Sequence, residues 1–78
     1  MGKRIKYNDY VIISYPELVE DSGQWKLRIA IFRKVNGVLR MEPFSVPHLY
    51  NTALEADIHG IAYGQRIIDE KIPGLKAG

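Results

Sequence analysis

Residues 24–44 read QWKLRIAIFRKVNGVLRMEPF, and this stretch decides the fold. Its first half alternates large apolar residues with smaller or charged ones, and the apolar set is Trp25, Leu27, Ile29 and Ile31. Because strand side chains point alternately to the two faces of a sheet, this alternation places the apolar set on one face. Asn36-Gly37 favours a tight turn, since both residues tolerate positive φ. The stretch therefore predicts a β-hairpin with strands at about 24–34 and 38–44, one face of which must be covered.

Another strand is predicted before the hairpin, at about residues 7–15, because β-formers fill residues 10–13 and Pro16 then removes a backbone donor. Both faces of this run are apolar, so two alternatives stay open for the core-facing pair: Tyr10 with Ile12, or Val11 with Ile13. Residues 17–23 are polar and rich in turn formers, which predicts a connection. Pro43 indicates that the third strand lies at a sheet edge or is about to end. Residues 45–50 are expected to cross from the sheet to a helix.

A helix is predicted over about residues 53–70. Thr52 and Glu55 form a capping-box pattern, in which side chains satisfy amide donors that the first helical turn leaves unpaired. Pro73-Gly74 ends the pattern, and residues 73–78 are expected to form a loose tail. Two apolar stripes recur at helical spacing; they consist of Leu54, Ile58, Ile61, Ile68 and Ile72, and of Ala53, Ala56, Gly60, Gly64 and Ile67. The residues expected to face water are Glu55, His59, Arg66 and Glu70.

The predicted fold class is α+β: a three-stranded antiparallel meander packed on one C-terminal helix, in the order β-β-β-α. Gly60 and Gly64 are unusual inside a helix, where each costs about 1 kcal/mol relative to alanine. We expect close packing to offset this cost. The packing partner is either the sheet of the same chain, with the Trp25 ring in the groove, or a second helix in a dimer.

The size and composition of the chain limit its class. Its 78 residues, 46% of them hydrophobic, suffice for one domain but not for two. It contains no cysteine, so we expect neither disulfides nor thiolate zinc sites. The N-terminal pattern differs from that of a signal peptide, and no run approaches the roughly 20 apolar residues of a membrane span. We therefore expect a cytoplasmic protein without a membrane partner.

The residues that could carry chemistry do not form a catalytic pattern. Glu55 and His59 share one helix face, but a metal needs further ligands, and no spacing rule supports His48 as the third. The serines lie outside nucleophile-elbow patterns, and the glycines do not form a phosphate loop. We therefore expect no enzymatic activity, no catalytic or metal-binding residues and no cofactor. Asp69 is expected to anchor a basic residue of the sheet.

Basic residues dominate the sheet-forming half of the chain and acidic residues the helical half, while the net charge is only +2. If Trp25 faces the helix, the other face of the sheet carries a candidate binding set; its members are Lys26, Arg28, Phe32, Lys34 and Arg40. The exposed aromatic residue favours burial by a protein partner or by a second copy in a homodimer. The alternative partner is nucleic acid, which a basic sheet binds in a groove or by base stacking. A half-solvated sheet without any binding role also requires polar outer residues.

Three motifs carry a resemblance that covers nearly the whole chain: GQWKLRIAI at residues 23–31, NTALEA at residues 51–56 and GQRIID at residues 64–69. They resemble the Gly-x-Trp strand, the Thr-x-x-Glu-Ala helix start and the terminal Ile-Asp of a family of small uncharacterised bacterial proteins. This resemblance implies a β-β-β-α fold and no assigned activity. In architecture, the chain is also similar to the DNA-binding domains of plant AP2 factors and to integrase arm-binding domains, which implies DNA reading by a three-stranded sheet.

Overall fold

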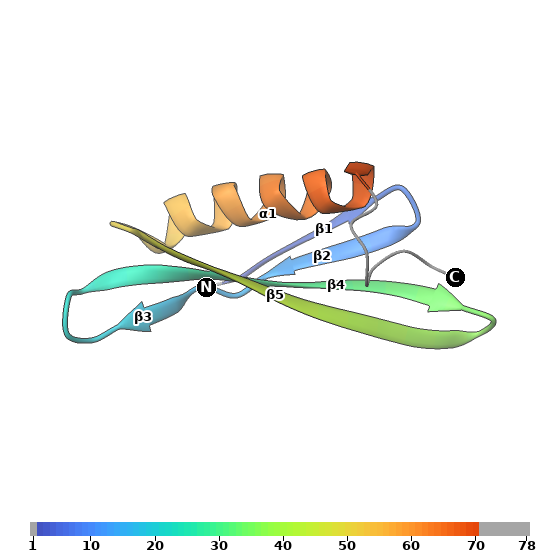
Figure 1. Ribbon diagram of the computed structural model, residues 1–78, viewed down its shortest axis with the longest axis horizontal. Coiled ribbons are helices and arrows are strands. Elements are labelled where there is room, and N and C mark those ends of the chain that lie inside the picture. The colour runs from blue at the N-terminus through green and yellow to red at the C-terminus, as the bar shows by residue number, and fades with distance from the viewer. Residues whose placement is uncertain (1, 71–78) are drawn as a thin grey trace.

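The computed structural model describes residues 2–70, which form one antiparallel sheet with one helix on a single face (Figure 1). The elements are β1 (Lys3–Tyr7), β2 (Tyr10–Ser14), β3 (Glu17–Val19), β4 (Gln24–Val35), β5 (Val38–Tyr50) and α1 (Ala53–Glu70). The predicted α+β class, with an antiparallel sheet and a C-terminal helix, is confirmed. The predicted tail at residues 73–78 lies outside the described residues, as does Ile72 of the first apolar stripe.

The sheet has five strands rather than the predicted three, because two short strands flank β2. β1 forms a hairpin with β2, and β3 pairs with the first residues of β4. β2 and β3 thus follow each other along one edge of β4, separated at Tyr15-Pro16, while β5 runs along the other edge. The strand predicted at 7–15 is shortened to Tyr10–Ser14, and the connection predicted at 17–23 contains a strand.

Two tight turns with left-handed residues fix the register of the sheet. Asn36 and Gly37 have φ values of 52° and 79°, as the predicted hairpin turn requires. Asn8, with a φ of 56°, lies in a second two-residue turn that joins β1 to β2. Asparagine tolerates this conformation better than most residues. The second turn is therefore what adds β1 to the sheet.

β5 continues to Tyr50, so the prediction that residues 45–50 leave the sheet is wrong. Among the described strands it pairs only with β4, which confirms the edge position expected from Pro43. The register slips opposite Lys26 and Leu27, where β5 carries two additional residues. An insertion of two residues preserves the alternation of side chains, so Tyr50 still packs against the core.

The core lies between α1 and one face of β4. Leu27, Ile29 and Ile31 are at most 2% exposed, which confirms the core face predicted for them. Ile12 is fully buried in the same cluster and pairs with Ile31. Of the two pairs that the sequence left open, Tyr10 with Ile12 is therefore the one that faces the core.

Gly60 and Gly64 allow α1 to approach the sheet closely. A Cβ atom at position 64 would lie 2.8 Å from Ile12 Cγ2, and one at position 60 would lie 3.0 Å from Ile29 Cγ2. Of the two explanations for the glycines, packing of the helix on its own sheet is confirmed. The Trp25 ring does not occupy the groove at Gly60 and Gly64, because Trp25 is only half-buried and lies outside the core cluster. The prediction that α1 buries this ring is therefore wrong.

α1 spans the predicted residues and begins with the predicted cap. The amide of Glu55 donates to Thr52 Oγ1 at 3.0 Å. The Glu55 carboxylate accepts from the amide of Asn51 at 3.1 Å, one residue earlier than in the usual capping box. Each side chain therefore satisfies one donor at the helix start, although the reciprocal bond is displaced by one position.

The glycine-containing stripe of α1 is the one that faces the sheet. It brings Ala56, Gly60, Gly64 and Ile67 into the core, together with Ile68 of the other stripe. Leu54 and Ile58 are 61% and 56% exposed, so the first apolar stripe leaves the core in its N-terminal half. The four residues expected to face water are all exposed. Among residues 2–70, no helix has both the length and the apolarity needed to cross a membrane.

One side-chain contact ties the β1–β2 hairpin to the C-terminal end of α1. The Tyr7 hydroxyl lies 2.9 Å from both carboxylate oxygens of Asp69 and donates to them. Asp69 was expected to contact a basic residue of the sheet, and its partner is a tyrosine instead. This hydrogen bond is the main reason why the pKa of Tyr7 is raised above its ordinary value of 10.0, and desolvation and the negative charge of Asp69 act in the same direction.

The Tyr7–Asp69 contact predicts a stability change at alkaline pH. The folded state holds the Tyr7 proton more tightly than the unfolded chain, so this contribution is complete below pH 10.0 and is lost as pH rises through the raised pKa. In an absorbance titration of the tyrosines, we expect Tyr7→Phe to remove a late-ionising component and Asp69→Asn to move that component to lower pH. An Asp69→Asn titration curve identical to that of the wild type would contradict the contact.

Candidate interaction surface

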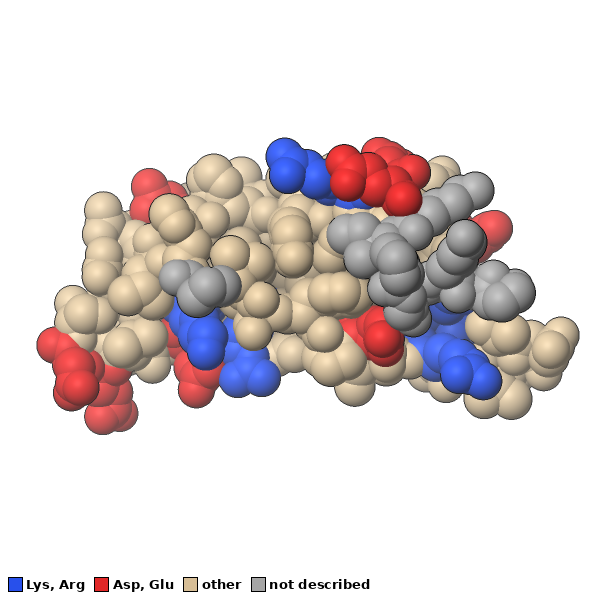
Figure 2. All heavy atoms as spheres, in the orientation of Figure 1, with Lys and Arg blue, Asp and Glu red and all other residues tan. Residues whose placement is uncertain are grey.

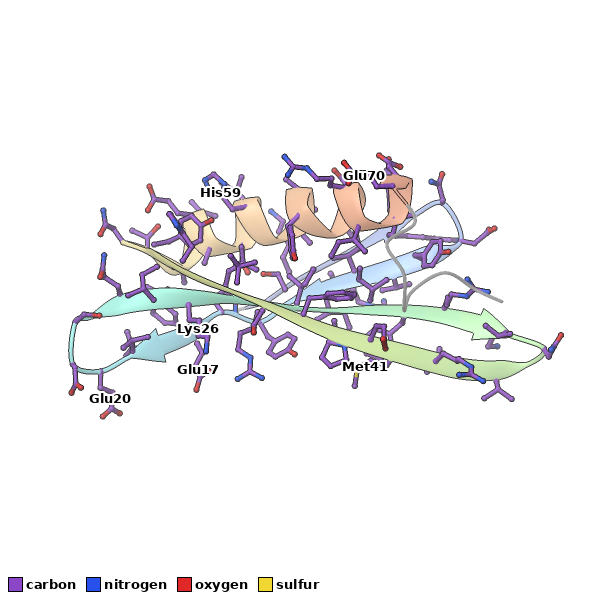
Figure 3. All side chains as sticks on the ribbon, viewed as in Figure 1. Glu17, Glu20, Lys26, Met41, His59 and Glu70 are labelled. Carbon is purple, nitrogen blue, oxygen red and sulfur yellow. The ribbon has the colours of Figure 1, made fainter. Side chains whose placement is uncertain are left out.

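The face of the sheet opposite α1 carries no covering element among residues 2–70 (Figure 1). We call this surface the outer face, and strand register defines its side chains, because the even-numbered residues of β4 alternate with the buried odd-numbered ones. Its basic residues are Arg4, Lys6, Lys26, Arg28 and Lys34. Its apolar centre consists of Val11, Ile13, Ala30, Phe32, Met41 and Pro43. In Figure 3, the labelled Glu17, Lys26 and Met41 lie on the side of the sheet away from α1.

The structure brings four of the five candidate binding residues together. Lys26, Arg28, Phe32 and Lys34 share the outer face of β4. Arg40 pairs with Arg33, which belongs to the odd-numbered set of β4. The Arg33 guanidinium donates to the Tyr10 hydroxyl at 3.1 Å, on the side of α1. Arg40 therefore lies on the opposite face from the other four.

Arg28 is held in place by its neighbours at one end of the outer face. Its Nη1 donates to Glu17 Oε1 at 2.9 Å, and its guanidinium carbon lies 5.6 Å from the centre of the Tyr15 ring. The hydrogen bond to Glu17 is the largest of the effects that raise the pKa of Arg28. Its Nε is buried and lacks a hydrogen-bond partner among the described residues. An exposed pair of this kind contributes little to stability, but it fixes the position of the guanidinium.

The apolar centre forms two adjacent rows, each crossing three strands. One row contains Val11, Phe32 and Met41, and the other contains Ile13, Ala30 and Pro43. Neighbouring strands lie about 4.8 Å apart, so three strands span about 10 Å. Met41 is 52% exposed and Ala30 only 5%. The centre is thus a small apolar block in which Met41 is more exposed than Val11, Ile13 or Phe32. Leu39, which pairs with Lys34 on the same face, adds a further apolar side chain that is 62% exposed.

The outer face is predominantly basic. Five of its eleven lysines and arginines lie on the outer face, where Glu17 is the acidic residue that the described strands contribute. β1 places Arg4 and Lys6 along one side of the apolar centre, and the other three cations lie at its two ends. Figure 2 shows basic side chains at two places along the sheet with acidic ones near them, and both kinds over the helix. The outer face therefore has a positive margin although the net charge of the chain is only +2.

The histidines lie in a row of rings that joins β5 to α1. The ring centres of His48 and Tyr50 are 4.9 Å apart, and Tyr50 stacks on His59 at 4.7 Å. Within residues 2–70, three or more metal-ligating side chains of the His, Cys, Asp and Glu types do not gather at one place. The three rings therefore pack β5 against α1.

Sequence reasoning missed the residues that β1 and β5 add to the outer face. Arg4 and Lys6 belong to it because β1 pairs with β2, and Met41 belongs to it because it pairs with Phe32. The alternation of KRIKY at residues 3–7 and the Asn8-Asp9 turn are the signals that could have identified β1.

Comparison with models of protein families, with curated proteins and with solved structures finds no match for this chain. The resemblances to small bacterial proteins and to the AP2 and integrase arm-binding domains therefore stay predictions.

Proposed function

We propose that this protein is a non-enzymatic interaction module of the cytoplasm that binds a partner protein through its outer face. The observation that supports the proposal is an apolar block that no element of residues 2–70 covers and that cations surround on three sides. It consists of Val11, Ile13, Ala30, Phe32, Met41 and Pro43. Protein interfaces have this anatomy: an apolar centre that becomes fully desolvated and a polar rim that stays hydrated. Met41 and Pro43 are exposed, whereas the other members of the block are half-buried or buried, and exposed apolar surface favours an interaction role.

Met41→Glu is the variant that tests this proposal, and Ile58→Glu is its matched control. Both replace an apolar residue that is more than half exposed, at 52% and 56%, so each should change stability by less than about 0.5 kcal/mol. A charge at position 41 must be desolvated when a partner covers the outer face, whereas position 58 lies on α1. We expect proteins retained from a lysate by immobilised wild type to be retained by I58E and lost with M41E.

Self-association through the same face is examined by sedimentation of the wild type and M41E. A dimer that dissociates on the Met41→Glu change would identify a second copy as the partner. If M41E retains the same proteins as the wild type and the wild type is monomeric at high concentration, the outer face is not a protein-binding surface.

Nucleic acid is the second candidate partner, and the segregation of five cations on the outer face favours it. A protein that neutralises phosphates with lysine and arginine binds more weakly as salt increases. Titration of labelled duplex and single-stranded DNA at low and moderate salt should then give a salt-dependent affinity that Lys26→Glu and Lys34→Glu both weaken. Absence of binding at low salt would contradict this candidate.

A further inference from the structure

The size of the apolar block sets the kind of element that can cover it. The block spans three strands, or about 10 Å, which matches the diameter of an α-helix with its side chains. The opposite face of the same sheet is already covered by one helix, α1 (Figure 1). A second helix on the outer face would complete a three-layer arrangement in which both faces of the sheet are buried.

The margin of the outer face sets the charge of that element. Arg4 and Lys6 lie on the β1 side, Lys34 at one end and Lys26 with Arg28 at the other. Among residues 2–70, only Arg28 of these five forms an ion pair, to Glu17. The β5 side carries Met41, Pro43 and Ser45, which are uncharged. A partner with carboxylates around an apolar stripe therefore complements this face, and complementary charge favours both encounter and orientation.

Two other occupants fit these observations less well. The side chains of the apolar centre contain no hydrogen-bond donor and only one weak acceptor, the Met41 sulfur, so they cannot read base edges. Phe32 is the only aromatic ring among them. A second copy that used the same face would bring the two basic margins together. The apolar stripe of its α1 that contains Gly60 and Gly64 is already buried against its own sheet, and the other stripe exposes Leu54 and Ile58 but buries Ile68. The α1 helix of a second copy therefore offers two exposed apolar side chains at one end and not a continuous stripe.

From these observations we infer that the outer face binds an acidic amphipathic helix of a different protein, with its apolar stripe on the Phe32–Met41 row and its carboxylates at the basic margin. This inference rests on the proposed function, because it names the partner of the same face. It also predicts that the affinity for the helix falls when salt increases, since salt screens charges near the surface, such as those at the basic margin of the outer face.

The test is selection of a displayed library of helical peptides against the wild-type protein. We expect enriched peptides to carry leucine, isoleucine or phenylalanine at helical spacing with aspartate or glutamate beside them. Met41→Glu should weaken their binding by about tenfold or more, which corresponds to about 1.4 kcal/mol. Lys6→Glu and Lys34→Glu should weaken it at low salt, and Ile58→Glu should leave it unchanged.

The outcomes separate the inference from the proposed function. Peptides that lose binding with M41E but are basic or non-helical would overturn the inference and leave the proposed function intact. Displacement of the selected peptides by single-stranded DNA, together with tighter binding of that DNA, would overturn it in favour of nucleic acid. A dimer that M41E dissociates would overturn it in favour of a second copy. Peptides whose binding is indifferent to M41E would overturn both.

Discussion

Replacing Gly64 with alanine is expected to destabilise this protein by up to about 2 kcal/mol, although alanine is the better helix former. The new Cβ would lie 2.8 Å from Ile12 Cγ2 and 3.1 Å from Ile12 Cδ1. Ile12 is fully buried between β2 and α1, so its side chain cannot move away without disturbing the core. Overpacking of this kind costs about 1–3 kcal/mol. The gain in helix propensity, about 1 kcal/mol, offsets only part of that cost.

Urea unfolding followed by circular dichroism measures the effect, and Ala62→Gly supplies the control. Ala62 is exposed on the same helix, so A62G reports the propensity difference between alanine and glycine in α1 without any packing change. Combining Gly64→Ala with Ile12→Ala should cost less than the sum of the single changes, because the added methyl group fills part of the cavity. If G64A is more stable than the wild type by the amount that A62G loses, the helix does not approach the sheet as closely as described.

The helix and the hairpin were predictable because their signals are local. A two-residue turn at Asn36-Gly37, a cap at Thr52 and the alternation in residues 25–31 each act over a few residues. No local signal of this kind indicates which stripe of the helix faces the sheet. Either of the two apolar stripes of the helix could pack against the sheet. The stripe with the smaller side chains does so, because it allows the closest approach, and Leu54 and Ile58 of the other stripe stay exposed.

Two strands escaped prediction because edge strands have weak patterns. β1 contains three basic residues in five and buries only part of one face, so KRIKY reads as a polar segment. β3 has three residues, too few for periodicity to be recognised. β1 is stabilised by pairing with β2, and β3 by pairing with β4. Such pairing cannot be read from the residue types within the short strand itself.

The placement of Arg40 was available from the turn alone. A two-residue loop pairs Val35 with Val38, and two further steps along the hairpin place Arg40 opposite Arg33. Lys26, Arg28, Phe32 and Lys34 were predicted from the alternation within one strand, whereas the face on which Arg40 lies is set by pairing across strands. Met41 illustrates the same point, because its position opposite Phe32 follows from register and not from its own residue type.

Replacing Ser14 with alanine is expected to destabilise the protein by about 2 kcal/mol, because it leaves the carboxyl group of Asp57 without its buried donor. Ser14 is fully buried, Asp57 is 5% exposed, and the Ser14 hydroxyl donates to Asp57 Oδ1 at 2.7 Å. This contact joins β2 to the first half of α1. A Cβ atom at position 60 would lie 3.1 Å from Ser14 Oγ, so the same close approach that requires Gly60 brings the two polar groups together.

Ser45→Ala is the matched control for Ser14→Ala, because Ser45 is an exposed strand serine of the outer face and its loss should change stability by less than about 0.5 kcal/mol. Asp57→Asn keeps an oxygen acceptor and should cost less than Asp57→Ala. In a double-mutant cycle, Ser14→Ala combined with Asp57→Ala should cost less than the sum of the two, since neither polar group is then left unpaired. Unfolding free energies of S14A and S45A that are equal within error would show that the buried pair does not hold α1 on the sheet.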